Sequence, residues 1–188
     1  PYTTLFRSWM ARLFSVGILI LVSFLVSCSG EKNPEYPEYS GVFHNKNLGV
    51  RISVGMTKDE VDALLTPTGN EMPQKPEEAC QAWSASYGEQ EDCIQIMYNW
   101  KTDIVDQISI EGEDGSETSN WALDERISLG STKEDIEKTY GTCSQESDDS
   151  LSYNYDSAGK KTHGENTAVI LNFCLDSEGR VFNVLAIQ

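Results

Sequence analysis

The feature that most constrains this chain is an eleven-residue stretch that occurs twice. Residues 51–61 read Arg-Ile-Ser-Val-Gly-Met-Thr-Lys-Asp-Glu-Val, and residues 126–136 read Arg-Ile-Ser-Leu-Gly-Ser-Thr-Lys-Glu-Asp-Ile. Six of the eleven pairs are identical and four more exchange like for like. The period of 75 residues is too long for a solenoid repeat. It predicts two copies of one small structural unit.

Each copy carries the signature of a helix start. A threonine is followed three residues later by an acid, Thr57 by Glu60 and Thr132 by Asp135. In a capping box the hydroxyl accepts from the backbone N–H of the acid, and the carboxylate accepts from the N–H of the threonine. A glycine two positions before each threonine allows a sharp turn into the helix. The pattern predicts a strand end, a turn and a capped helix in each copy.

The predicted helices are short. The first runs from Lys58 toward Pro67, and Val61, Leu64 and Leu65 fall on one apolar stripe. Helices of two to three turns are not stable alone in water. They are therefore expected to lie on the strands that follow them.

Strands are predicted where apolar and polar residues alternate. The predicted strands are 81–87, 94–100 and 104–110 in the first copy, and 151–155, 169–175 and 180–187 in the second. Residues 113–120 read as an acidic linker. The expected fold class is α+β: two tandem units, 48–112 and 121–188, each a short capped helix followed by an antiparallel meander of three to four strands.

Residues 1–27 are expected to comprise upstream residues and a signal peptide, with Met10 as the start. An uncharged run from Leu13 to Val26 has signal-peptide length and ends in Leu-Val-Ser-Cys at residues 25–28. Small residues before a cysteine resemble the lipobox of bacterial lipoproteins. The resemblance implies a lipid on Cys28 and anchoring through acyl chains. An ordinary secretory signal with an incidental cysteine is the alternative.

The resemblance to lipoproteins also implies a location in the cell. By the sorting rule of enterobacterial lipoproteins, Ser29 after the cysteine favours the outer membrane. The chain has 14 basic and 30 acidic residues, a net charge of −16, which repels phosphate backbones and argues against nucleic acid as a partner. Residues 28–47 repeat Pro-Glu-Tyr and are expected to form a flexible tether between lipid and fold.

Taken together, a lipobox, a repeated Gly-x-Thr helix start and a meander resemble the BamE/SmpA-like (SmpA/OmlA) family of small outer-membrane lipoproteins. Two such units in tandem, each with a cysteine pair, are similar to the beta-lactamase inhibitor protein fold. The resemblance implies helices on one side of an antiparallel sheet and a role in the cell envelope. Unlike single-unit members of that family, this chain has two copies of the motif.

Apart from Cys28 the chain has four cysteines, Cys80, Cys93, Cys143 and Cys174. In an oxidising envelope disulfides are expected, and four cysteines allow three pairings. The repeat favours one pair in each copy, Cys80 with Cys93 and Cys143 with Cys174. Metal binding is disfavoured because the chain has no Cys-x-x-Cys and no histidine near a cysteine in sequence.

Motifs of catalysis are missing from the sequence. It has no Gly-x-Ser-x-Gly, His-Glu-x-x-His or Gly-x-Gly-x-x-Gly. Residues 159–162, Gly-Lys-Lys-Thr, lack the order of a phosphate-binding loop and are expected to be a solvated loop. The chain is therefore predicted not to be an enzyme and to need no cofactor.

Four strand aromatics are the candidate partner-binding residues: Trp83, Tyr87, Tyr153 and Tyr155. Such side chains are favoured at binding hot spots, although a place in the core is the alternative for each. Tyr98 and Trp100 share a predicted face with isoleucines and are expected in the core. The predicted function is a non-catalytic, lipid-anchored protein-binding module of the outer membrane and periplasm, an envelope assembly or scaffold accessory. An inhibitor that docks its sheet on a beta-lactamase or protease is the alternative.

Overall fold

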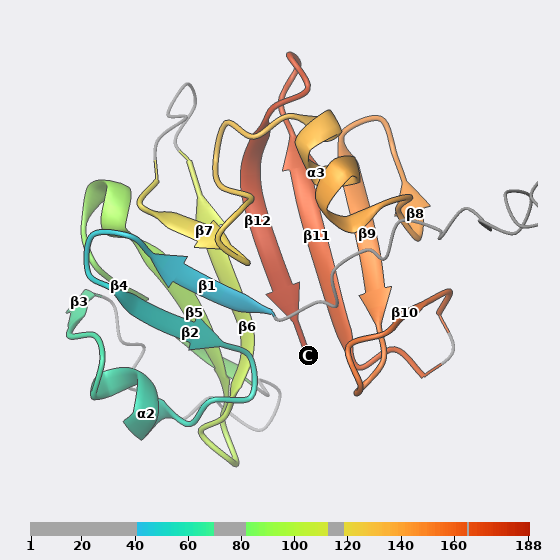
Figure 1. Ribbon diagram of the computed structural model, residues 1–188. Helices are drawn as coiled ribbons and strands as arrows, with labels where there is room; N and C mark the ends of the chain where they lie inside the picture. The colour runs from blue at the N-terminus through green and yellow to red at the C-terminus, as the bar shows by residue number, and fades with distance from the viewer. Residues whose placement is uncertain (1–40, 70–81, 113–118, 165) are drawn as a thin grey trace, which may run out of the picture. The chain divides into compact units, whose positions relative to one another are not determined.

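The computed structural model describes residues 41–69, 82–112, 119–164 and 166–188, all within one compact unit (Figure 1). Its helical elements are α2 (Lys58–Asp62), the 3₁₀ turn η1 (Gln90–Asp92) and α3 (Lys133–Tyr140). Its strands are β1 (Val42–Asn45), β2 (Val50–Ser53), β3 (Pro67–Gly69), β4 (Ala82–Tyr87), β5 (Ile94–Asn99), β6 (Val105–Glu111), β7 (Trp121–Leu123), β8 (Gln145–Glu146), β9 (Ser150–Tyr155), β10 (Lys161–Thr162), β11 (Val169–Leu175) and β12 (Val181–Ile187).

Most of these strands form one antiparallel sheet of nine strands. Its order is β10-β9-β11-β12-β6-β5-β4-β3, with β8 beside β9. The first half of the chain contributes the meander β4-β5-β6, and the second contributes β9, β11 and β12. The two sets join through β6 and β12, which pair from Gln107–Ile187 to Glu111–Asn183.

A second sheet of three strands has the order β2-β1-β7. In its middle strand, Phe43 pairs with Ile52 on one side and Leu123 on the other. Figure 1 shows this sheet and α3 on the same side of the nine-stranded sheet. One face of the large sheet is thus covered by described elements.

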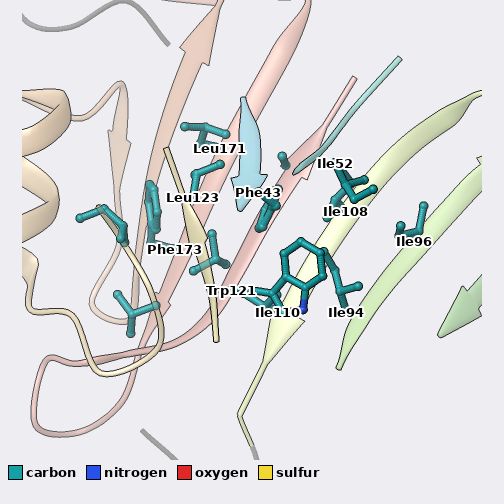
Figure 2. Close-up of a cluster of buried hydrophobic side chains, with 14 of the residues drawn as sticks. Phe43, Ile52, Ile94, Ile96, Ile108, Ile110, Trp121, Leu123, Leu171 and Phe173 are labelled. Atoms are coloured by element: carbon teal, nitrogen blue, oxygen red, sulfur yellow. The ribbon is translucent and has the colours of Figure 1, made fainter. Parts of the chain in front are cut away.

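The hydrophobic core lies between the two sheets and beneath the helices (Figure 2). Trp121, the largest fully buried side chain, lies near Ile94 and Ile110 of the large sheet. Complete burial of an aliphatic or aromatic side chain contributes about 1.5–3 kcal/mol. Because the core draws on both halves of the chain, neither half encloses a core of its own.

The turn and the capped helix start predicted for each copy of the repeated motif are confirmed. Both capping boxes are present, Thr57 with Glu60 and Thr132 with Asp135. The glycine before each cap has a positive φ, +87° at residue 55 and +80° at residue 130, a conformation that other residues rarely adopt. The first helix is only five residues long, and Leu64, predicted to lie on the buried stripe, is 44% exposed.

The predicted fold class is wrong. The described part of the chain is mostly antiparallel strand with two α-helices, and its strands do not separate into two tandem helix-plus-meander units. Pairing of β6 with β12 makes one continuous sheet, and β1 crosses between the halves by pairing with β7. Local patterns predicted six of the described strands, but they carry no information on which strand edges meet.

The predicted start of the folded region at residue 48 is also too late. Strand β1, which lies inside the predicted tether, is the centre of the three-stranded sheet, and its Phe43 is fully buried. The six strands predicted from alternation are confirmed as β4, β5, β6, β9, β11 and β12. The bounds of β11 are as predicted, and no end of the other strands differs by more than one residue.

Candidate functional site

The nine-stranded sheet has one covered face and one face over which no described helix or strand packs. On the covered side, one row of buried residues crosses six strands: Tyr153, Leu171, Ala186, Ile108, Ile96 and Ala85. Side chains alternate between faces along a strand. Their neighbours in sequence therefore point to the other side.

Two rows of side chains cross that other side, which we call the open face. The first row is Ser152, Asn172, Leu185, Ser109, Gln95 and Ser86. The second row is Asn154, Ile170, Ile187, Gln107, Met97 and Ser84. Ser109 and Asn154 are buried, and the other side chains are half-buried or exposed.

None of these twelve side chains is charged, although the chain carries 30 acidic and 14 basic residues. The nearest carboxylates lie toward the strand ends: Glu111 closes β6, and Asp106 accepts a hydrogen bond from Asn99 at 3.1 Å. Uncharged hydroxyls and amides dominate the face. Asn172, for example, donates to the hydroxyl of Ser152 at 2.9 Å.

The middle of the open face is apolar. Ile170 is paired with Ile187, and Gln107 lies between Ile187 and Met97 in the same row. Leu185 occupies the adjacent row on the same strand as Ile187. An apolar centre within an uncharged polar surround is the composition found at the cores of protein interfaces, which are depleted of charge.

Three of the four strand aromatics predicted to bind a partner lie instead on the covered side. Tyr87 and Tyr153 are 0% exposed and Tyr155 is 4% exposed, so the hypothesis that they are surface hot spots is wrong for these three. Trp83 lies in β4 opposite Tyr98, but its side chain lies outside what the structure describes. The three tyrosines are core residues, as the alternative interpretation predicted. Alternation of side chains along their strands places them on the face that the helices cover.

The buried tyrosines use their hydroxyls in the fold. Tyr87 donates to Asp62 of α2 at 3.0 Å and shares a 2.7 Å hydrogen bond with the hydroxyl of Tyr98. Burial and these hydrogen bonds raise the pKa of Tyr87 far above its ordinary value. The hydroxyl therefore stays protonated and anchors α2 to the sheet. Trp100, expected in the core, lies in the β5–β6 turn and is 37% exposed.

The predicted disulfide between Cys143 and Cys174 is not present. Both are free thiols, as is Cys93, whereas Cys80 lies outside the described residues. Cys174 pairs with Ser150 in register with the open face, whereas Cys143 packs against the core on the side of α3. The sheet separates the two sulfurs. Burial raises the pKa of the Cys174 thiol, and also that of Cys93.

A pocket of about 460 Å³ lies where the end of β2 approaches the turn after β9 and the end of β12. It is lined by Gly41, 53–55, 156–159, Ala168, Val169 and Gln188. No residue of the open face belongs to this lining. Its volume is within the range of small-molecule pockets in proteins.

The turn at the pocket occurs twice in the chain, a signal that sequence reasoning missed. Residues 156–160 read Asp-Ser-Ala-Gly-Lys and residues 176–180 read Asp-Ser-Glu-Gly-Arg. In each turn the aspartate Oδ1 accepts from two backbone N–H groups, at 2.8–2.9 Å. The Gly-Lys-Lys-Thr stretch begins in the first turn, and its Lys161 donates to the carbonyl of Tyr140 at the end of α3.

Within the described ranges, no group of three His, Cys, Asp or Glu side chains is arranged to hold a metal ion. No helix in that part of the chain is long and apolar enough to cross a membrane. Cys28 and its surrounding motif lie outside the described residues.

Comparison with known proteins finds no matching family model and no matching curated protein. Among solved structures, the chain is similar to a DUF4309 family protein (YjgB) from Bacillus subtilis subsp. subtilis strain 168. The two share 15% identity at a TM-score of 0.39, over 76% of this chain and 82% of that one. A TM-score this low does not establish a common fold, and it says nothing about activity.

Proposed function

We propose that this chain is a non-catalytic, lipid-anchored binding module of the bacterial cell envelope that docks the open face of its large sheet on a protein partner. The observation that carries the proposal is the absence of charge from all twelve open-face residues on a chain with a net charge of −16. A solvated surface of so acidic a chain would be expected to carry carboxylates. The nearest carboxylates, Glu111 and Asp106, lie outside these two rows, and an uncharged centre of the sheet face favours contact with another protein.

Two further features support this role. The Leu-Val-Ser-Cys sequence at residues 25–28 favours anchoring through a lipid. The acidic balance of the chain disfavours nucleic acid as that partner. Antiparallel sheets tolerate one face in water, so the open face needs no partner for folding.

The docking surface is tested by placing a charge at its centre. Gln107→Arg sets a cation between Ile187 and Met97. Ser177→Arg, in the exposed β11–β12 turn, is the matched control with the same change of charge. Both variants are purified from detergent-solubilised envelopes of the native host, and co-purifying proteins are quantified by mass spectrometry.

We expect Gln107→Arg to lose at least one partner that wild type and Ser177→Arg retain, because an uncompensated charge at an interface centre is costly. Thermal melts of the purified variants exclude unfolding as the cause. Retention of every partner by a folded Gln107→Arg variant would refute the open face as the docking site. If the lost partner is an enzyme that the wild-type chain inhibits, the inhibitor role replaces that of an assembly accessory.

The lipid anchor is tested separately. Cys28→Ala should release the chain from membranes into the soluble fraction, since acyl chains provide the binding energy of such anchors. Cys143→Ala, which removes a thiol of the folded region, should leave membrane association unchanged. Membrane retention of the Cys28→Ala variant after a salt wash would contradict lipid anchoring.

A further inference from the structure

The pocket of 460 Å³ is separate from the open face and calls for its own explanation. Its walls come from both halves of the chain: the end of β2, the turn after β9 and the residue after β12. The lining residues include the apolar Val54 and Val169 and the hydroxyl-bearing Ser53 and Ser157. The carboxylate in this lining belongs to Asp156.

The two related turns show what is unusual about Asp156. In the β11–β12 turn, Oδ1 of Asp176 accepts two backbone N–H groups, and Oδ2 forms an ion pair with Nε of Arg180 at 3.8 Å. In the pocket turn, Oδ1 of Asp156 accepts the same two bonds, from Ala158 and Lys160. Within the described part of the chain, however, Oδ2 of Asp156 has no hydrogen bond or ion pair.

Asp156 is half-buried. A half-buried carboxylate is less well solvated than a fully exposed one, and a bound cationic donor compensates for that loss. Charge-assisted hydrogen bonds of this kind are stronger than neutral ones. The net charge of −16 adds a long-range preference for cations over anions.

We propose that this pocket binds a primary ammonium group carried on a short, partly apolar body, with Asp156 as the counter-ion. The ammonium donates to the free oxygen of Asp156, and the apolar body lies against Val54 and Val169. The serine hydroxyls accept or donate the remaining hydrogen bonds. Such a group is the side chain of a lysine or free alkylamine, or the amino end of a peptide.

Isothermal titration calorimetry on the full-length chain in mild detergent tests the proposal with three probes. N-acetyl-lysinamide presents an alkylammonium, alaninamide presents an α-ammonium, and N-acetyl-norleucinamide is a neutral analogue of the first. Titrations into micelles without protein serve as blanks. We expect an ammonium probe to bind and the neutral analogue not to bind. The tighter of the two ammonium probes identifies the source of the ligand.

Asp156→Asn is the decisive variant because the amide oxygen preserves the two turn hydrogen bonds while the negative charge is lost. It should weaken binding of the ammonium probe by about tenfold or more. Asp176→Asn changes the net charge equally at the related turn and should leave binding unchanged. Ala158→Trp should abolish binding by filling the pocket without a change of charge, and it decides the outcome if Asp156→Asn fails to fold.

Three results would overturn the proposal. The first is that neither ammonium probe binds to the wild-type chain. Another is equal affinity for the neutral analogue. The third is equal weakening by Asp156→Asn and Asp176→Asn, which would show general electrostatic attraction in place of a site. Because the open-face variants touch none of the pocket residues, failure here leaves the docking function standing, and the reverse also holds.

Discussion

A buried polar junction joins the two sheets and can be tested by removal of one amide. Asn45 is 0% exposed. Its Oδ1 accepts from the backbone N–H groups of Asn47 and Leu48, each at 2.9 Å, and its Nδ2 donates to Oδ1 of Asp92 at 2.9 Å. The same carboxylate oxygen accepts from Asn120 at 3.0 Å. We expect Asn45→Ala to destabilise the fold substantially.

The magnitude follows from the three hydrogen bonds. A neutral bond contributes about 0.5–1.5 kcal/mol and one to a charged group about 1.5–3 kcal/mol. Asn47 and Leu48 are exposed, so water replaces part of what their N–H groups lose. Asp92 keeps its bond from Asn120. The expected loss in the free energy of unfolding is therefore about 2–4 kcal/mol.

Urea unfolding followed by tryptophan fluorescence measures this loss, since Trp121 is buried and donates to the carbonyl of Asp92 at 2.8 Å. Asn47→Ala is the matched control: the same substitution two residues away, at an exposed side chain. It should change stability by less than about 0.5 kcal/mol. If the two variants differ by less than that, the junction contributes nothing to stability.

Asn45→Asp separates hydrogen bonding from charge. It keeps the acceptor for the turn but places a second carboxylate beside Asp92. The nearby charge of Asp92 raises the folded-state pKa of the carboxyl group introduced at position 45. A raised carboxyl pKa costs stability above that pKa, and the cost disappears as the pH falls through it. The deficit of Asn45→Asp relative to wild type should therefore shrink on acidification, and a deficit independent of pH would refute this explanation.

Three further outcomes are expected. Alkylation of the native, unreduced protein should modify both Cys143 and Cys174, and a peptide map that links them would contradict the separation of their sulfurs by the sheet. Tyr87→Phe should lower the free energy of unfolding by about 1–3 kcal/mol through loss of the hydrogen bond to Asp62, and an unchanged urea midpoint would contradict it. Hydrogen bonds from Thr132, the N-cap of α3, lower the pKa of Asp135, so the melting temperature of wild type should exceed that of Asp135→Asn near neutral pH. The difference in melting temperature should vanish below pH 3.8. A difference that persists in acid would contradict this explanation.

The sequence predicts those features of the fold that depend on neighbouring residues. The two capping boxes need only a threonine and an acid three positions apart, so Thr57 with Glu60 and Thr132 with Asp135 were predictable. Strict alternation around Gln95 and Met97 likewise identified β5 and both of its faces. The open face could therefore have been assembled from sequence if the order of the strands had been known.

Strand order is where the prediction failed, because it depends on contacts between residues far apart in the chain. Nothing in the pattern of residues 105–111 indicates that β6 pairs with β12, for example through Glu111 and Asn183. The same pattern would suit a strand at the exposed edge of a sheet. Phe43 was assigned to the tether since a four-residue strand without alternating neighbours carries almost no local signal. The burial of the strand tyrosines was missed for a related reason. A buried tyrosine hydroxyl needs a hydrogen-bond partner, and the partner of Tyr87, Asp62, is distant in sequence.

The repeated motif is better explained by the fold than by a ligand. In each copy the glycine N–H donates to the first residue of the last strand of its set, Gly55 to Val105 and Gly130 to Val181, both at 2.8 Å. The threonine that follows forms a bridge one residue earlier on the same partner segment. In both copies, the shared residues therefore hold the turn and the start of the helix against a strand. Asp156, the proposed counter-ion of the pocket, belongs to neither copy of the motif.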